Sequence, residues 1–134
     1  MIALDIDNFK SINDAHGHAV GDRVLNMVAG ALLAGSRSFD FIARWGGEGF
    51  LCVAVNVNED QLQAVAERLR LLVEESAYDI EGTPIRVTVS AGAALYEPEE
   101  SIAQLLQHAD TLLYASKSGG KNRVTFSSVD STVS

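Results

Sequence analysis

The spacing of apolar residues along the chain predicts five strands and three helices. Residues 1–6 form a short apolar run that ends in aspartates, which is typical of a buried strand. Three later segments, at about residues 21–33, 60–74 and 101–116, repeat apolar side chains every three or four residues, as amphipathic helices do. The side chains expected to face inward are Val24, Leu25, Val28 and Leu32, then Leu62, Val65, Leu69, Leu72 and Val73, and finally Ile102, Leu105, Leu106, Leu112 and Leu113.

The remaining strands are predicted between and after the helices. Residues 39–45 and 49–57 are joined across Gly46-Gly47-Glu48, and the glycines and the short loop predict a hairpin. Residues 85–95 follow a turn at 81–83 and alternate strictly, which is typical of a strand buried on one face. Residues 123–126 predict a closing strand at the sheet edge.

The order of these elements predicts an α+β fold. It follows the βαββαβ pattern with later additions, so that helices flank a central, mainly antiparallel sheet, as in ferredoxin-like domains, nucleotidyl cyclases and polymerase palms. In this topology we expect the first and second strands to lie side by side in the sheet centre. Because unrelated functions share the topology, the function has to be inferred from the site residues.

Composition narrows the class of protein. The 134 residues, 47% of them hydrophobic, suit one domain, expected over residues 1–127 with a flexible tail at 128–134. The net charge of −8 argues against binding to a nucleic-acid polymer or an anionic membrane. No apolar stretch is long enough for membrane insertion, and the start does not resemble a signal peptide. Cys52 is the single cysteine, which favours a buried thiol in the reducing cytoplasm.

Two acidic segments provide the first candidate chemistry. Asp5 and Asp7 lie at the end of the first strand, and Glu48 lies in the hairpin turn. If strand end and turn meet, carboxylates converge near the Ile6 carbonyl and make a hard oxygen site suited to Mg²⁺ or Mn²⁺. The simpler alternative is that Asp7 caps the short helix after it and Asp5 is a solvated strand end.

Three separated segments of the chain carry distinctive sequence patterns. The first is Asp5-Ile6-Asp7-Asn8-Phe9-Lys10-Ser11-Ile12-Asn13-Asp14 with Gly17-His18 and Gly21-Asp22, the second is Arg44-Trp45-Gly46-Gly47-Glu48-Gly49-Phe50, and the third is Tyr114-Ala115-Ser116-Lys117-Ser118-Gly119-Gly120-Lys121-Asn122-Arg123. These segments resemble the signatures of the GGDEF family of diguanylate cyclases. They follow the family's order and cover nearly the whole chain, which makes the resemblance specific.

The resemblance implies a reaction and its metal ligands. Family members condense two GTP molecules into cyclic di-GMP, with one GTP on each domain of a homodimer. The 3′-hydroxyl of one nucleotide attacks the α-phosphate of the other, and pyrophosphate leaves. The metal ligands implied are Asp5, the Ile6 carbonyl and Glu48, with Glu48 also a candidate proton acceptor.

The resemblance also implies contacts to the base. Asn13 and Asp22 match the pair that hydrogen-bonds the guanine edge, and a carboxylate there excludes adenine, which lacks the N1–H and N2–H₂ donors. The alternatives are that Asp22 caps a helix and that Asn13 serves a turn. Phe9 and Leu25 match the walls of the base pocket, although both suit an ordinary core equally well.

Three lysines match the phosphate-binding positions of the family. These are Lys10, Lys117 and Lys121, with Lys10 counted among the catalytic residues as well, and Gly46 and Gly47 belong to the substrate-binding turn. Taken singly, a lysine is more often only solvated.

A second site is implied by Arg37 and Asp40. They match an RxxD motif at the family's spacing before the glycine pair, where relatives bind cyclic di-GMP as an inhibitor, and Arg68 is a candidate to complete the site. The planar guanidinium fork suits guanine edges and phosphates. The four-residue pattern alone also occurs by chance, and an arginine on a helix surface is usually only solvated.

The chain departs from the family pattern in two places. Gly49 stands where relatives have a second acid, and the segment and helix that precede the first strand in relatives are not in this sequence, so we expect a domain that lacks its N-terminal helix. The first departure leaves two hypotheses open, a diguanylate cyclase and an inactive domain that binds cyclic di-GMP or GTP. An RNA-recognition module is disfavoured because the basic surface and aromatic stripes it requires are missing.

Overall fold

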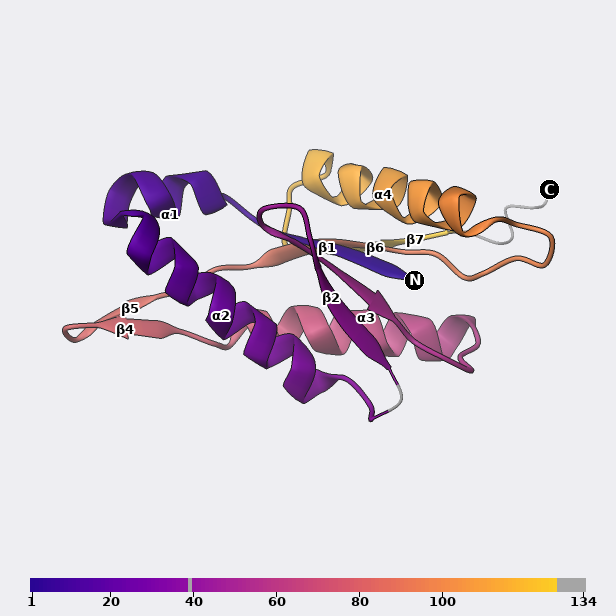
Figure 1. Ribbon diagram of the computed structural model, residues 1–134, viewed down its shortest axis with the longest axis horizontal. Coiled ribbons are helices and arrows are strands. Elements are labelled where there is room, and N and C mark those ends of the chain that lie inside the picture. Colours follow the sequence, from indigo (N-terminus) through magenta and orange to yellow (C-terminus); the bar gives the residue numbers. More distant parts are fainter. Residues whose placement is uncertain (39, 128–134) are drawn as a thin grey trace.

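The chain folds as a five-stranded sheet with helices on both faces. The computed structural model describes residues 1–38 and 40–127. Figure 1 shows α4 on one face of the sheet, and α2 and α3 on the other. This arrangement confirms the expected α+β class. The elements are β1 (Ile2–Ile6), α1 (Phe9–His16), α2 (His18–Gly35), β2 (Phe41–Trp45), β3 (Gly49–Val53), α3 (Glu59–Glu74), β4 (Tyr78–Ile80), β5 (Thr83–Ile85), β6 (Val89–Ala93), α4 (Ile102–Ser118) and β7 (Val124–Phe126).

The strand order places β1 at the centre of the sheet. The order is β2-β3-β1-β6-β7, and every pairing is antiparallel except that of β6 with β7. The expectation that the first two strands are neighbours is therefore wrong, because β3 lies between them and β2 is an edge strand. The end of β1 and the hairpin turn meet all the same, since Asp5 pairs with Gly49 at the start of β3. The Ile6 amide donates to the Glu48 carbonyl at 3.2 Å.

The strand predicted over residues 85–95 is shorter and more buried than its alternation indicates. Residues 83–85 belong to the small β4–β5 hairpin, and β6 is buried along its whole length. The face of β6 that the sequence assigns to solvent is covered by α4. A Cβ at Gly92 would lie 2.2 Å from the Leu113 amide nitrogen, so the helix backbone approaches closely only because this position has no side chain. Gly92 is small because a helix covers it, and Ser90 is fully buried and donates to the Asp7 carboxylate.

Several other helix and strand boundaries differ from the predicted ones. Both strands of the β2–β3 hairpin are shorter than predicted, Phe39 lies outside the described residues, and α1 and β4 are additional elements. Ile102 is not inward-facing, because it opens α4 and is 66% exposed. The tail predicted at 128–134 lies outside the described residues, whereas the Ser127 amide still donates to the Ala93 carbonyl.

The main core lies between the sheet and the α2–α3 layer. It includes the predicted inward residues Val24, Val28 and Leu32 of α2 and Leu69 of α3, together with Phe50 of β3. A smaller cluster around Ala3 and Leu105 lies under α4. Cys52 is fully buried, and this burial raises the pKa of its thiol to about 11, which keeps it neutral. Within the described ranges, no helix is both long and apolar enough to cross a membrane.

Candidate functional site

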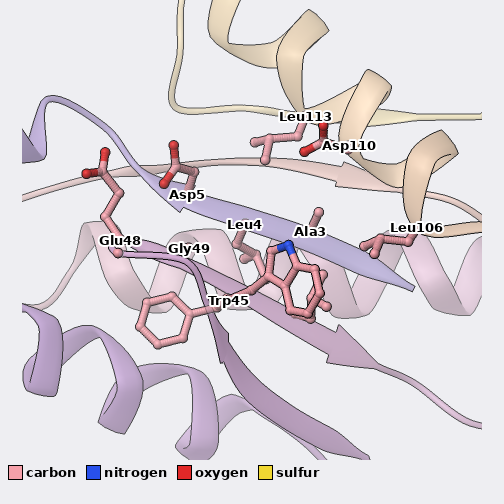
Figure 2. A pocket seen from close by; sticks show the side chains of 12 residues that line it. Ala3, Leu4, Asp5, Trp45, Glu48, Gly49, Leu106, Asp110 and Leu113 are labelled. Atoms are coloured by element: carbon pink, nitrogen blue, oxygen red, sulfur yellow. The ribbon is translucent and has the colours of Figure 1, made fainter. Parts of the chain in front are cut away.

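Asp5 and Glu48 converge at one end of the sheet. Asp5 is the penultimate residue of β1, and Glu48 lies in the β2–β3 turn, one residue before the strand that pairs with β1. Both line a cavity of about 300 Å³, together with Trp45 of β2 and Leu113 of α4. Figure 2 shows the two carboxylates projecting to the same side of the sheet. The structure thus brings together two of the predicted metal ligands.

The electrostatics of this pair favour a cation. Burial raises the pKa of Asp5, although the nearby Lys117 ammonium works in the opposite direction. Burial also raises the pKa of Glu48, and repulsion from Asp5 adds to the shift. Both carboxylates are therefore harder to ionise than in water. A positive charge beside them relieves both the desolvation and the repulsion.

The available donors suit a metal that arrives with a nucleotide. The carboxylates of Asp5 and Glu48 and the carbonyl of Ile6 are hard oxygen donors, the type that Mg²⁺ and Mn²⁺ prefer. No group of three or more His, Cys, Asp or Glu side chains in the described part of the chain could hold a metal ion. Magnesium commonly binds one or two protein carboxylates and completes its shell with water and substrate phosphates. The donor set fits that mode.

Lys117 already contacts the acidic site in this structure. Its side chain comes from the last turn of α4 and is 22% exposed. Its Nζ lies 3.3 Å from Asp5 Oδ2, 2.9 Å from Asp7 Oδ1 and 3.2 Å from the Ile6 carbonyl oxygen. Lys121 differs, since its ammonium donates to Asn8 Oδ1 at 2.7 Å. Lys10 is exposed in the first turn of α1.

Asp7 is a central residue that the site prediction omitted. It is 3% exposed, and its carboxylate accepts four hydrogen bonds. The donors are Ser90 Oγ at 2.6 Å, Thr88 Oγ1 at 2.7 Å, Lys117 Nζ at 2.9 Å and the Asn122 amide at 3.0 Å. Burial opposes ionisation, but the hydrogen bonds from Ser90, Lys117 and Thr88 hold the pKa of Asp7 below its usual range.

The simple alternatives for the two aspartates are wrong. Asp7 does not cap α1, because the N-cap is Asn8 and it forms no capping hydrogen bond through its side chain. Asp5 is not a merely solvated strand end, because it is ion-paired with Lys117. Thr88 and Ser90 occupy the positions that the alternation assigns to solvent, and instead they donate to Asp7.

Three non-glycine residues with left-handed backbone surround Asp7. They are Asn8 (φ 58°), Lys121 (φ 66°) and Asn122 (φ 49°). This conformation costs free energy and persists where neighbouring contacts enforce it, often at functional sites. Here the Asn122 amide is directed at Asp7, and Asn8 accepts from Lys121. The strained residues thus join the end of β1 to the loop after α4.

The residues predicted to contact guanine lie at the junction of α1 and α2. Asn13 Oδ1 is buried and has no hydrogen-bond partner among the described residues. A Cβ at Gly21 would collide with this oxygen, so the glycine makes room for it. Asp22, next in sequence to Gly21, is exposed within α2 and does not cap it, because α2 begins at His18. The unsatisfied buried amide oxygen of Asn13 is the feature of this junction that suits a ligand site.

Phe9 and Leu25 belong to the main core. Each is 7% exposed, so most of either side chain is inaccessible to a ligand. The Phe9 ring approaches Gly21, where a Cβ would lie 3.2 Å from Cζ. A base at this junction would therefore contact only the outer edge of these two side chains.

Arg37 and Asp40 form a tight pair at the end of α2. Arg37 donates through Nε at 2.9 Å and Nη2 at 2.8 Å to the two carboxylate oxygens of Asp40, and Nη2 also reaches the Val55 carbonyl at 3.0 Å. The hydrogen bonds from Arg37 hold the pKa of Asp40 below its usual range. Arg68 of α3 lies nearby, since its Nε would be 3.9 Å from a Cβ at Gly35. Arg68 therefore lies against the last residue of α2, two positions before Arg37.

The β2–β3 turn is folded closely around Gly49, the position where the chain departs from the family pattern. A Cβ at this position would lie 2.5 Å from the Trp45 carbonyl oxygen and 3.4 Å from that of Leu4. Both obstacles are backbone atoms, so a side chain at position 49 requires the turn to open. Arg44 supports the closed turn by donating to the Gly47 carbonyl at 2.7 Å. Restoring an acid here would change the turn as well as the charge.

The fold and site define a ferredoxin-like α+β domain with an acidic, cation-attracting end of its central strand. The diguanylate cyclase GGDEF domain family matches residues 1–123, and the chain belongs to this family.

Named relatives agree with this assignment. The chain is 44% identical over 128 residues to Diguanylate cyclase A of Treponema denticola, covering 95% of this chain but 34% of that protein. It superposes with a TM-score of 0.88 and 36% identity on the GGDEF domain of DgcB from Caulobacter crescentus in complex with c-di-GMP, covering 93% of this chain and 75% of that one. The active GGEEF domain of a diguanylate cyclase from Vibrio cholerae gives a TM-score of 0.84 at 32% identity, with 93% and 80% covered. Where that name has GGEEF, this chain has Gly-Gly-Glu-Gly-Phe at positions 46–50.

Proposed function

We propose that this domain binds GTP at the end of β1 and, as a homodimer with one GTP per domain, condenses two GTP molecules into cyclic di-GMP. The observation that supports the proposal is the convergence of Asp5, Glu48 and the Ile6 carbonyl beside a lysine from α4. The 3′-hydroxyl of each nucleotide attacks the α-phosphate of the other. Two pyrophosphates leave, one for each phosphodiester bond formed.

The residues of this chain have separate tasks in that reaction. Asp5, Glu48 and the Ile6 carbonyl would hold Mg²⁺ or Mn²⁺, which when bound neutralises phosphate charge and acidifies the attacking hydroxyl. Glu48 would accept the hydroxyl proton. Lys117 contacts the Ile6 carbonyl at the end of β1, and Lys121 contacts Asn8 just after it. These two lysines would hold the leaving phosphates.

Replacing Asp22 by asparagine tests the guanine assignment. A carboxylate accepts from both N1–H and N2–H₂ of guanine, whereas an amide presents a donor to one of them. In the Asp22→Asn variant we expect GTP affinity to fall about 10- to 100-fold and ATP affinity to change little. Isothermal titration of nucleotide-stripped protein with each nucleotide and Mg²⁺ measures both values.

Asp14→Asn is the matched control, because it removes the same charge from an exposed position on the neighbouring helix. Its GTP affinity should stay within about 2-fold of the native value. Unchanged selectivity between GTP and ATP in the Asp22 variant would exclude this residue from guanine recognition.

A second candidate function is a receptor for cyclic di-GMP without turnover. The closed turn around Gly49 supports it, since the turn has neither the second acid nor room for one. Arg37, whose side chain is partly exposed, and Arg68 near the end of α2 would bind cyclic di-GMP away from the acidic site, with Asp40 holding Arg37 in position. Such a receptor would bind cyclic di-GMP and leave GTP unconverted.

A further inference from the structure

The ammonium of Lys117 lies among the oxygens assigned to a metal ion. Of its three close oxygens, Asp5 Oδ2 and the Ile6 carbonyl belong to the proposed metal ligands. The third is Asp7 Oδ1, and the Asp7 carboxylate also accepts hydrogen bonds from Ser90, Thr88 and the Asn122 amide. Lys117 therefore contacts Asp5 and the Ile6 carbonyl, which are also proposed metal ligands, and Asp7, which is not.

The lysine and a divalent ion compete for the shared oxygens. A divalent ion of this class binds oxygen at about 2.0–2.2 Å, so it would lie within a few ångströms of an ammonium that contacts the same atoms. Like charges at that separation repel strongly in a partly buried site. Metal binding to Asp5 and Ile6 therefore requires Lys117 to release them.

Asp7 provides the point about which Lys117 can move. Its carboxylate is held in place by two hydroxyls of the β5–β6 segment and by a backbone amide, none of which depends on the metal ligands. At 2.9 Å it also makes the shortest of the three contacts to Nζ. A lysine anchored there can leave Asp5 without leaving the site.

We propose that Lys117 is an internal counter-cation that neutralises the acidic site before nucleotide binds, yields Asp5 and the Ile6 carbonyl to the incoming metal, and stays anchored to Asp7. The transfer of its released charge to a nucleotide phosphate rests on the proposed function, whereas the competition with metal does not. Asp7 then acts as a positioning residue for Lys117. The device keeps metal affinity low until a nucleotide supplies further oxygens.

Manganese titration without nucleotide tests the competition. The sharp electron paramagnetic resonance signal of free Mn²⁺ reports how much of the ion the protein binds. We expect Lys117→Met to bind Mn²⁺ at least about 10-fold more tightly than the native chain, because the competing charge is gone. Arg123→Met is the matched control, because it removes one exposed positive charge from the loop after α4, and its Mn²⁺ affinity should stay within about 2-fold of the native value.

Two further variants make the result decisive. Lys117→Gln keeps a donor for Asp7 but carries no charge, so it should also bind Mn²⁺ more tightly, and it replaces Lys117→Met if that variant fails to fold. Adding Asp5→Asn to Lys117→Met should return the affinity to the native level or below, which places the bound ion at this site. Equal or weaker binding by both Lys117 variants, or a gain that survives Asp5→Asn, overturns the proposal. Because no nucleotide is present, a failure to bind or convert GTP does not affect this reading.

Discussion

Glutamine at position 48 is expected to lower cyclic di-GMP formation at least about 100-fold. Glu48 is one of the two carboxylates that converge at the end of β1, and the variant keeps the size of the side chain while removing its charge. Loss of that charge weakens metal binding and removes the candidate proton acceptor. Product formed per unit time from GTP and Mg²⁺, measured by liquid chromatography and mass spectrometry, gives the ratio to the native chain.

The control for Glu48→Gln is Glu75→Gln. Glu75 is exposed at the end of α3, far along the chain from the acidic site, so its removal should leave turnover within about 2-fold. Turnover of the Glu48 variant within a few-fold of the native rate would contradict the assignment of this residue.

Asparagine at position 7 is expected to destabilise the fold by about 3 kcal/mol at pH 7. The Asp7 carboxylate is buried and accepts four hydrogen bonds, two of them from hydroxyls of the β6 region. An asparagine amide group replaces one of the two accepting oxygens by a donor, so two of the four present donors face a donor, and Lys117 loses the closer of its two charged partners. Urea unfolding followed by circular dichroism measures the difference in free energy of unfolding.

The pH dependence of this loss follows from the lowered pKa of Asp7. Burial works against ionisation, but the hydrogen bonds prevail, so the folded state holds the carboxylate ionised below its ordinary pKa of about 3.9. The stabilisation is therefore complete above that ordinary value and is lost as the pH falls through the folded pKa. The gap between native and Asp7→Asn proteins should be full at pH 7 and shrink as the pH falls below about 3.9.

Asp14→Asn is the control, because it makes the same change at an exposed position. It should change the free energy of unfolding by less than about 0.5 kcal/mol, both at pH 7 and below the ordinary aspartate pKa. A cost below about 1 kcal/mol for Asp7→Asn at pH 7 would show that its four hydrogen bonds contribute little.

Much of the fold could be predicted because its signals are local. The apolar face of α2 and the glycines of the hairpin depend on residues close together in sequence, and both predictions are confirmed. The burial of β6 could not be predicted in the same way. Ser90 and Gly92 look like solvent-facing positions, but α4 packs over Gly92, and Ser90 donates to the buried Asp7.

In the site, too, features that depend on neighbouring elements could be predicted, whereas those that depend on distant segments could not. The meeting of Asp5 and Glu48 is predicted from a pairing of the first two strands, and that pairing is wrong; they meet because β1 pairs with β3, and Glu48 directly precedes β3. The roles of Asp7 and Lys117 could not be predicted, since the contact between them joins residues 110 positions apart and depends on where α4 ends. The effect of Gly49 on the turn likewise required the positions of two backbone carbonyls.

Conversion of GTP by the native chain tests the central claim most directly. Protein stripped of bound nucleotide is incubated with GTP and Mg²⁺, and with ATP in parallel, and products are identified by liquid chromatography and mass spectrometry. Our account predicts cyclic di-GMP from GTP, with two pyrophosphates released per product, and no cyclic dinucleotide from ATP. Protein that binds GTP but forms no cyclic di-GMP would contradict it and would leave the receptor function in its place.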